Sequence, residues 1–200
     1  RRRHTRYPLV TGVQTCALPI CELGYRYLGG RYADGLTVDD LGPHDVVLLP
    51  AFGVETALLE RLRARQVQMV DAVCGEVMLV WKRVREYARA GYTTVIHGAP
   101  AHQETRATVS RTGRDDPFLP HAIDAPGAWI VLRGLDDAHC LARWVREELR
   151  APELLAHFQG CTSPGFEPQR DLQRIGIANQ TDRKSTRLNS SHEWISRMPS

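Results

Sequence analysis

The sequence predicts an α/β protein built from repeated β-α-β units with parallel sheets. From residue 45 onward, short apolar runs alternate with longer segments that carry apolar residues at helical spacing. The chain of 200 residues has 42% hydrophobic content, which is enough to bury a core in one or two domains. Because strands separated by helices usually pair in parallel, we expect parallel sheets.

Five strands are expected along this part of the chain. They are DVVLLP at 45–50, VQMV at 67–70, YTTVIH at 92–97, AWIVL at 128–132 and RIGIANQT at 174–181. The first and the third are expected to be buried strands.

Helices are expected between these strands. The first, VETALLERLRAR at 54–65, is followed by a helix that starts after Cys74 and stops at Gly91. A third opens at 136–140, and a short fourth lies near 152–158. The second helix carries one apolar stripe opposite its basic residues, and the third carries another; the members are Val77, Val80, Trp81, Val84, Tyr87 and Ala88, then Ala138, Leu141, Ala142, Val145 and Leu149.

The charge distribution argues against a nucleic-acid partner. The formal net charge is +3, but residues 1–21 carry four arginines and no acid, and residues 183–200 carry three arginines, one lysine and one glutamate. Residues 22–182 are therefore net acidic and show no basic footprint. No run is long and apolar enough for a membrane span, and the N-terminus lacks the apolar centre of a signal peptide, so we expect a cytoplasmic protein without membrane contact.

The two ends differ in composition from the rest of the chain. Residues 1–21 and 183–200 lack sustained periodicity, and both resemble translated sequencing-adapter sequence. Composition alone would equally suit disordered basic tails. We expect both ends to be non-native and disordered, and residues 22–182 to form an incomplete α/β core.

Polar residues follow several of the expected strands. The strand ends read PAFG at 50–53, DAVCG at 71–75, HGAPAHQE at 97–104 and ANQT at 178–181. In open parallel sheets, ligands bind beyond the carboxyl ends of the strands. We therefore expect these groups to converge on one edge.

Cys74 stands between a strand and the start of a helix, where the helix dipole favours a thiolate. That position suits a metal ligand or a nucleophile, although a lone cysteine at such a turn is more often a small buried residue. Cys140 is expected in the core and Cys161 in a loop without a role. Without CxxC spacing, a disulfide framework is not expected.

His97, His102 and Glu104 form the second candidate group. A histidine and a carboxyl two residues apart on a loop could bind an anionic substrate and transfer a proton. A solvated polar loop is the simpler interpretation, and no third ligand at zinc spacing is evident.

Four segments, taken in order, carry a family resemblance. They are DVVLLPAFGVE, VDAVCGEVMLVWKRVREYARAGYTTVIHG, HQETRATVS and IGIANQT. In this order they resemble the 4-hydroxy-3-methylbut-2-enyl diphosphate reductase family, the LytB (IspH) iron–sulfur enzymes, in the plant and cyanobacterial-like branch. The resemblance covers most of residues 35–181 and is more specific than any single motif.

The resemblance implies a reductive dehydroxylation in the non-mevalonate isoprenoid pathway, with an allylic diphosphate as substrate. It implies a [4Fe–4S] cluster held by three cysteines, with ferredoxin or flavodoxin as electron donor. When the family's functional residues are placed on the matching positions of this chain, Cys74 is one cluster ligand and His102 contacts the diphosphate. Glu104 donates the proton, and Thr181 orients the substrate hydroxyl.

The chain also departs from the family pattern. The first and third cluster cysteines are expected before residue 22 and beyond residue 182, and no cysteine here matches them. Phe52 stands where the bacterial branch has a substrate-binding histidine. We therefore expect an internal fragment that is inactive alone. Two rival hypotheses are a non-catalytic α/β fold that binds a phosphate ligand and a Cys/His hydrolase that uses Cys74.

Overall fold

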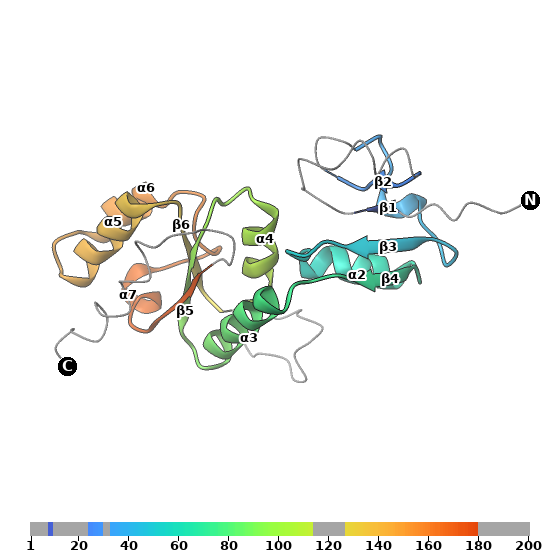
Figure 1. Cartoon of the computed structure of the whole chain (residues 1–200). Coiled ribbons are helices and arrows are strands. Elements are labelled where there is room, and N and C mark those ends of the chain that lie inside the picture. The colour runs from blue at the N-terminus through green and yellow to red at the C-terminus, as the bar shows by residue number, and fades with distance from the viewer. Residues whose placement is uncertain (1–7, 10–23, 30–32, 114–126, 180–200) are drawn as a thin grey trace, which may run out of the picture.

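The computed structural model describes residues 8–9, 24–29, 33–113 and 127–179. Within these ranges the chain forms two parallel sheets, which lie on either side of the helices α3 and α4 (Figure 1). The predicted α/β class with parallel sheets is confirmed.

The first sheet has the strand order β2-β1-β3-β4. Its strands are β1 (Pro8–Leu9), β2 (Arg26–Tyr27), β3 (Val46–Leu49) and β4 (Gln68–Asp71). The short 3-10 helix η1 (Val38–Asp40) precedes β3, and α2 (Thr56–Ala64) connects β3 to β4. One face of α2 packs on the sheet through a buried apolar cluster, whose members are Val38, Leu41, Val47, Leu49, Val54, Leu59, Leu62 and Val67.

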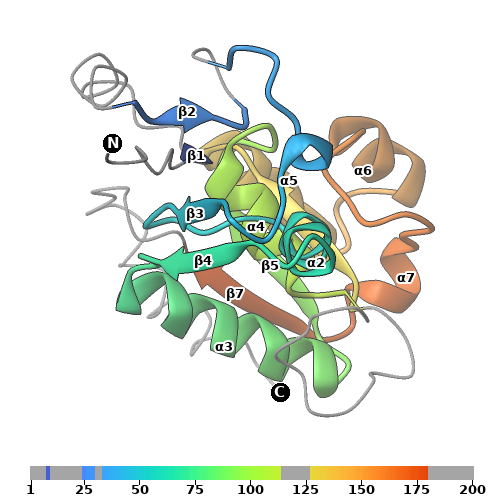
Figure 2. The same cartoon turned by 90° about the vertical axis from the view of Figure 1, so that its right-hand side faces the viewer.

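The second sheet has the strand order β6-β5-β7. The central strand β5 (Thr93–His97) pairs with β6 (Trp129–Leu132) on one side and with β7 (Ile175–Asn179) on the other. All five residues of β5 are buried, as expected for a parallel strand with helices on both faces. Its helices are α3 (Gly75–Arg89), α4 (Gln103–Ser110), α5 (Leu135–Val145), α6 (Ala151–His157) and α7 (Pro168–Asp171). Figure 2 shows α3 running alongside β7.

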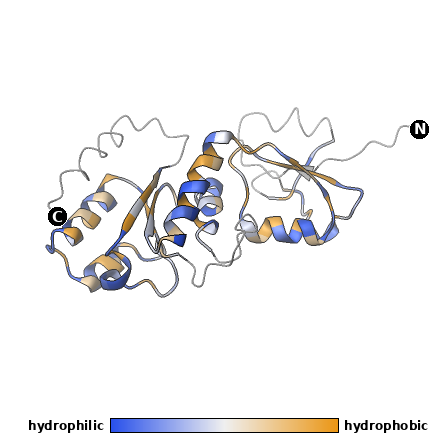
Figure 3. Cartoon of the chain, turned by 90° about the horizontal axis from the view of Figure 1, so that it is seen from below, coloured by the Kyte–Doolittle hydropathy of each residue, from blue (hydrophilic) through white to orange (hydrophobic). Residues whose placement is uncertain are grey.

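Amphipathic helices contribute their apolar faces to the core, together with the strands and the loops between them. Figure 3 shows bands of hydrophobic and hydrophilic residues alternating along the helices. In α3, the apolar stripe predicted from the sequence includes Val77, Trp81, Val84 and Ala88, and all four are buried. A small cluster of Val77, Trp81 and Ala107 lies between α3 and α4, so these two helices have a core of their own.

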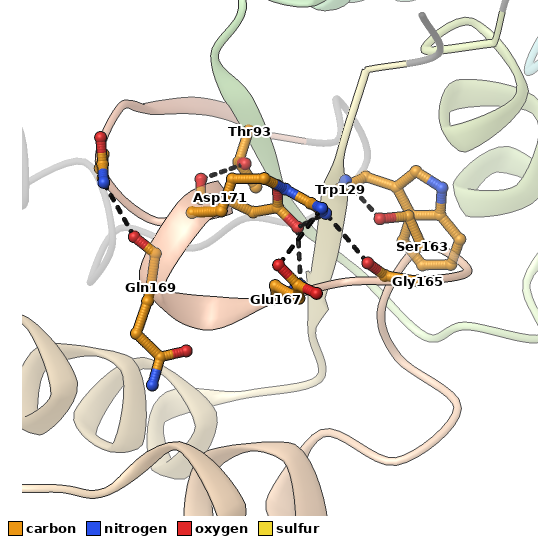
Figure 4. Close-up of polar contacts among 9 residues, drawn as sticks. Thr93, Trp129, Ser163, Gly165, Glu167, Gln169 and Asp171 are labelled. Carbon is orange, nitrogen blue, oxygen red and sulfur yellow. Dashed lines mark hydrogen bonds and ion pairs between the residues drawn. The ribbon is translucent and has the colours of Figure 1, made fainter.

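The segment 163–173 closes the amino ends of the second sheet (Figure 4). Ser163 and Trp129 exchange hydrogen bonds, and the hydroxyl of Thr93 donates to the carbonyl of Asp171. The carboxylate of Asp171 in turn accepts from the backbone N–H of Glu167 at 2.7 Å. These contacts occupy the amino edge, which leaves the carboxyl edge of the sheet for a functional site.

Several elements differ from the sequence prediction. Residues 103–110 form the helix α4, where a polar loop was expected. The helix α5 ends at Val145, because Glu147 has a positive φ of 62°, so Leu149 packs on the core from the following loop. Cys161 lies in a loop, as expected, and its side chain is buried in the core.

Part of the N-terminal end also belongs to the described structure. Residues 8–9, within the segment expected to be disordered, form β1 between β2 and β3. The other residues of 1–21 and all of 183–200 lie outside the described residues. The expectation that the ends are non-native therefore stays a prediction.

Candidate functional site

Cys74 lies on the turn between β4 and α3. The strand β4 ends at Asp71, whose carboxylate accepts a hydrogen bond from the backbone N–H of Val73 at 2.9 Å and so tightens the turn. Cys74 is the N-cap residue of α3, and its carbonyl accepts from Met78 to open the helix. Its side chain is exposed. The predicted position of the thiol, at a helix start beyond a strand end, is confirmed by this geometry.

His102 and Glu104 lie at the start of α4, on the corresponding side of the second sheet. After β5, the backbone N–H of His102 donates to the carbonyl of Ala99 at 2.9 Å, and this turn places His102 as the N-cap residue of α4. The imidazole is exposed. Glu104 lies in the first helical turn and is only 5% exposed, so its carboxyl is sheltered from bulk water.

His97 has a different role from His102. It is the last residue of β5 and is buried, and its Nδ1 lies 3.3 Å from Oδ1 of Asn179, its register partner in β7. Among the described residues, no hydrogen bond joins the Cys74 thiol to a histidine. The Cys/His hydrolase hypothesis therefore gains no support from this geometry. Thr181 lies outside the described residues.

The loop after β3 connects the Cys74 turn with the start of α4. The backbone N–H of Cys74 donates to the carbonyl of Ala51 at 2.8 Å. The ring of the next residue, Phe52, has its centroid 6.4 Å from that of His102. Cys74, His102 and Glu104 therefore belong to one region, although they come from two sheets. The part played by Phe52 in this link was not predicted, because a ring contact between residues 50 positions apart leaves no local pattern.

The cysteines differ in whether they can reach a ligand. Cys140 and Cys161 are buried in the core of the second sheet, and burial raises the pKa of the Cys140 thiol. Of the cysteines in the described ranges, Cys74 alone is exposed. Those ranges hold no group of three or more histidine, cysteine, aspartate or glutamate side chains that could bind a metal ion. Cys74 thus fits as one thiolate ligand of a metal cluster, and further ligands would have to come from outside the described residues.

No helix in the described part of the chain has the length and apolar character needed to cross a membrane.

Fold and site together define a class of parallel α/β proteins that gather a thiol, an imidazole and a carboxyl beyond the carboxyl ends of their strands. Comparison with known proteins identifies the family. The chain belongs to the LytB protein family, whose sequence profile matches residues 30–197. The resemblance found in the sequence is thereby confirmed.

Curated relatives are named 4-hydroxy-3-methylbut-2-enyl diphosphate reductase. The protein of Synechococcus sp. strain RCC307 is 37% identical over 154 residues, which are 77% of this chain and 34% of the relative. The protein of Gloeobacter violaceus is 37% identical over 171 residues, or 82% of this chain and 38% of the relative. A chloroplastic reductase of Botryococcus braunii is 37% identical over 137 residues, which are 68% of this chain and 24% of the relative. The chain spans about a third of the length of the two cyanobacterial relatives.

A solved structure shares the fold. It is described as (E)-4-hydroxy-3-methyl-but-2-enyl diphosphate reductase, the terminal enzyme of the non-mevalonate pathway. It matches with a TM-score of 0.60 and 20% identity, over 96% of this chain and 53% of the solved chain.

Proposed function

We propose that this chain is part of a 4-hydroxy-3-methylbut-2-enyl diphosphate reductase. The reaction reductively removes the hydroxyl of an allylic diphosphate and gives isopentenyl and dimethylallyl diphosphate. Two electrons and two protons replace the C–O bond with a C–H bond and release water. The observation that carries the proposal is the buried Glu104 beside the exposed His102, linked through residues 51–52 to the exposed Cys74.

Cys74 would supply one thiolate to a [4Fe–4S] cluster, with the other ligands outside the described residues. When bound, the cluster would supply the two electrons and a Lewis acid. The exposed side chain of Cys74 at the start of α3 supports this assignment, because a helix N-terminus stabilises a negatively charged ligand.

His102 and Glu104 would divide binding and proton transfer between them. The exposed imidazole of His102 can donate a hydrogen bond to a diphosphate oxygen, and the N-terminus of α4 favours an anion at the same place. Glu104, in the first turn of the helix and sheltered from water, would deliver the proton to the departing hydroxyl. By resemblance, Thr181 would orient that hydroxyl, and ferredoxin or flavodoxin would donate electrons in the cytoplasm.

Glu104→Gln tests the proton-transfer role. The experiment requires an enzyme completed with the missing regions of a related reductase. Glutamine keeps the shape of the side chain but cannot donate the proton, so we expect turnover to fall by roughly a hundredfold to ten-thousandfold. Substrate affinity and the cluster signal should stay close to the parent values. His102→Ala should instead weaken substrate binding, because it removes a hydrogen-bond donor to an anionic group.

Glu60→Gln provides the matched control, since Glu60 is an exposed acid on α2. Steady-state kinetics and substrate titration would separate the three variants. Parental turnover in Glu104→Gln, or a loss of activity explained by loss of the cluster, would contradict the assigned role.

A further inference from the structure

A buried arginine lies at the C-terminal end of α4, the helix whose start carries His102 and Glu104. Arg111 follows α4 directly as its C-cap residue and is only 1% exposed. Its guanidinium carbon lies 4.1 Å from the ring centroid of Trp81 in α3, and its Nη2 donates to the carbonyl of Val54 at 3.0 Å. Because removing a guanidinium from water is costly, such burial depends on specific partners. Arg111 therefore connects α4, α3 and the loop after β3.

Trp81 also contacts the loop after β3 directly. A Cβ atom added to Gly53 would lie 2.2 Å from Cη2 of the indole, which is far inside van der Waals contact. Gly53 also has a φ of +74°, a conformation that side chains disfavour. Glycine is thus required for the close approach of loop and indole, and Arg111 and Gly53 both contact Trp81.

Two further contacts tie the same loop to α4. The backbone N–H of Thr56 donates to the hydroxyl of Ser110 at 3.1 Å, and Arg106 forms an ion pair with Glu55 at 2.7 Å. Residues 50–56 are consequently attached along their length to the helices of the second sheet. The same residues carry the Ala51 carbonyl and the Phe52 ring that face the Cys74 turn and His102.

We infer that Arg111 is a positioning residue of the site. Together with Trp81 it sets the placement of residues 50–54 against the start of α4. It thereby aligns the turn that carries Cys74 with the helix start that carries His102 and Glu104. This inference rests on the proposed function for its catalytic consequence, whereas its geometric consequence can be measured alone.

Crosslinking in the 200-residue chain measures the geometry. Phe52→Cys and His102→Cys would be introduced together, with Cys16, Cys21 and Cys74 replaced by serine, and the rate of crosslinking by a short bifunctional thiol reagent would be followed. Phe52 follows a strand of the first sheet and His102 follows a strand of the second, and their rings are neighbours. The crosslinking rate therefore reports how closely the loop after β3 is held to α4.

We expect Arg111→Met to lower this rate roughly tenfold or more, because small displacements of paired groups strongly reduce their effective concentration. Arg111→Lys keeps a buried cation and donor and should recover much of the rate. Arg83→Met is the matched control, since Arg83 is an exposed residue on the same helix as Trp81. If circular dichroism shows that the methionine variant does not fold, Arg111→Gln takes its place with the same expected loss.

Kinetics of the completed enzyme provide the second measurement. We expect Arg111→Met to lower kcat about a hundredfold, with a smaller change in KM, and Arg111→Lys to restore part of kcat. A parental crosslinking rate in Arg111→Met would overturn the inference even if the enzyme is an active reductase. A crosslinking rate that depends on Arg111 in a completed protein without reductase activity would support the positioning role and refute the proposed function.

Discussion

Asp137 is almost completely buried at the start of α5, where three groups donate to its carboxylate. The backbone N–H and guanidinium of Arg133 donate at 2.7–2.8 Å, and Nε2 of His157 lies 2.7 Å from Oδ1. Hydrogen bonding from Arg133 is the largest cause that holds the pKa of Asp137 at about 2, below its ordinary value of 3.8. One residue thus joins β6, α5 and α6 through charge and hydrogen bonding.

The pH dependence of the free energy of unfolding should show the contribution of the Asp137 carboxylate. Because the folded-state pKa is lowered, its contribution is fully present above about pH 4 and is lost as the pH falls toward 2. Arg133 is half-exposed, so we expect this pH-dependent part to be about 1 kcal/mol. Asp137→Asn should lower the free energy of unfolding at pH 7 and flatten its fall between pH 5 and 2. Urea denaturation at several pH values measures both effects.

Asp136→Asn is the control for this experiment. Asp136 is the exposed neighbour of Asp137 in the same helical turn. A parental pH profile in Asp137→Asn, or an equal change in both variants, would show that the buried network does not produce the effect.

At the scale of elements, α3 packs closely on the edge strand β7. A Cβ atom added to Gly176 would lie 2.5 Å from Cγ of Tyr87, and the Tyr87 hydroxyl donates to the carbonyl of Ile177 at 3.4 Å. The aromatic ring therefore lies directly on the backbone of the strand. The missing side chain of Gly176 sets how closely helix and sheet approach each other.

Gly176→Ala should force this helix away from the sheet. We expect a loss of about 1–3 kcal/mol in the free energy of unfolding, which is the usual cost of overpacking. The loss should shrink when Tyr87 is also replaced by alanine, because the clash is then removed. Gly42→Ala adds its Cβ to open space and should have little effect. Chemical denaturation of the four variants would measure these differences, and equal losses in both tyrosine backgrounds would contradict the contact.

At the scale of the whole molecule, both sheets contribute residues to the candidate site, through the helices between them. The described residues provide a single exposed cysteine for that site, at the start of α3. A [4Fe–4S] cluster needs several thiolates. Under the proposed function, the described residues would therefore contribute one cluster ligand, Cys74, together with His102 and Glu104.

Anaerobic reconstitution with iron and sulfide tests this interpretation. We expect the 200-residue chain to hold no stable stoichiometric [4Fe–4S] cluster, because Cys74 is the single exposed thiol among its described residues. The completed enzyme should bind the cluster, and its Cys74→Ser variant should lose it. Iron analysis and EPR spectroscopy after reduction provide the readout. A stoichiometric cluster in the chain alone would contradict the prediction that further ligands must be supplied.

Local sequence patterns were sufficient for much of the fold. The strand β5 and the buried stripe of α3 were predicted because apolar spacing reflects local geometry. The position of Cys74 at a strand-to-helix turn was predicted for the same reason. The helix α4 was missed, because its eight residues include only two apolar side chains. Its buried face is instead formed largely by Glu104, Thr105 and Thr108.

The sequence by itself therefore determined the alternation of the main strands and helices from β3 onward, the parallel α/β class, the family and the chemical groups at the strand ends. Tertiary structure alone decided how those groups meet. The burial of Arg111 depends on Trp81 and Val54, which lie 30 and 57 positions away along the chain. A charged side chain can be buried only where protein groups replace the water around it. Packing between elements that are distant in sequence determines which groups these are, and no local pattern predicts them.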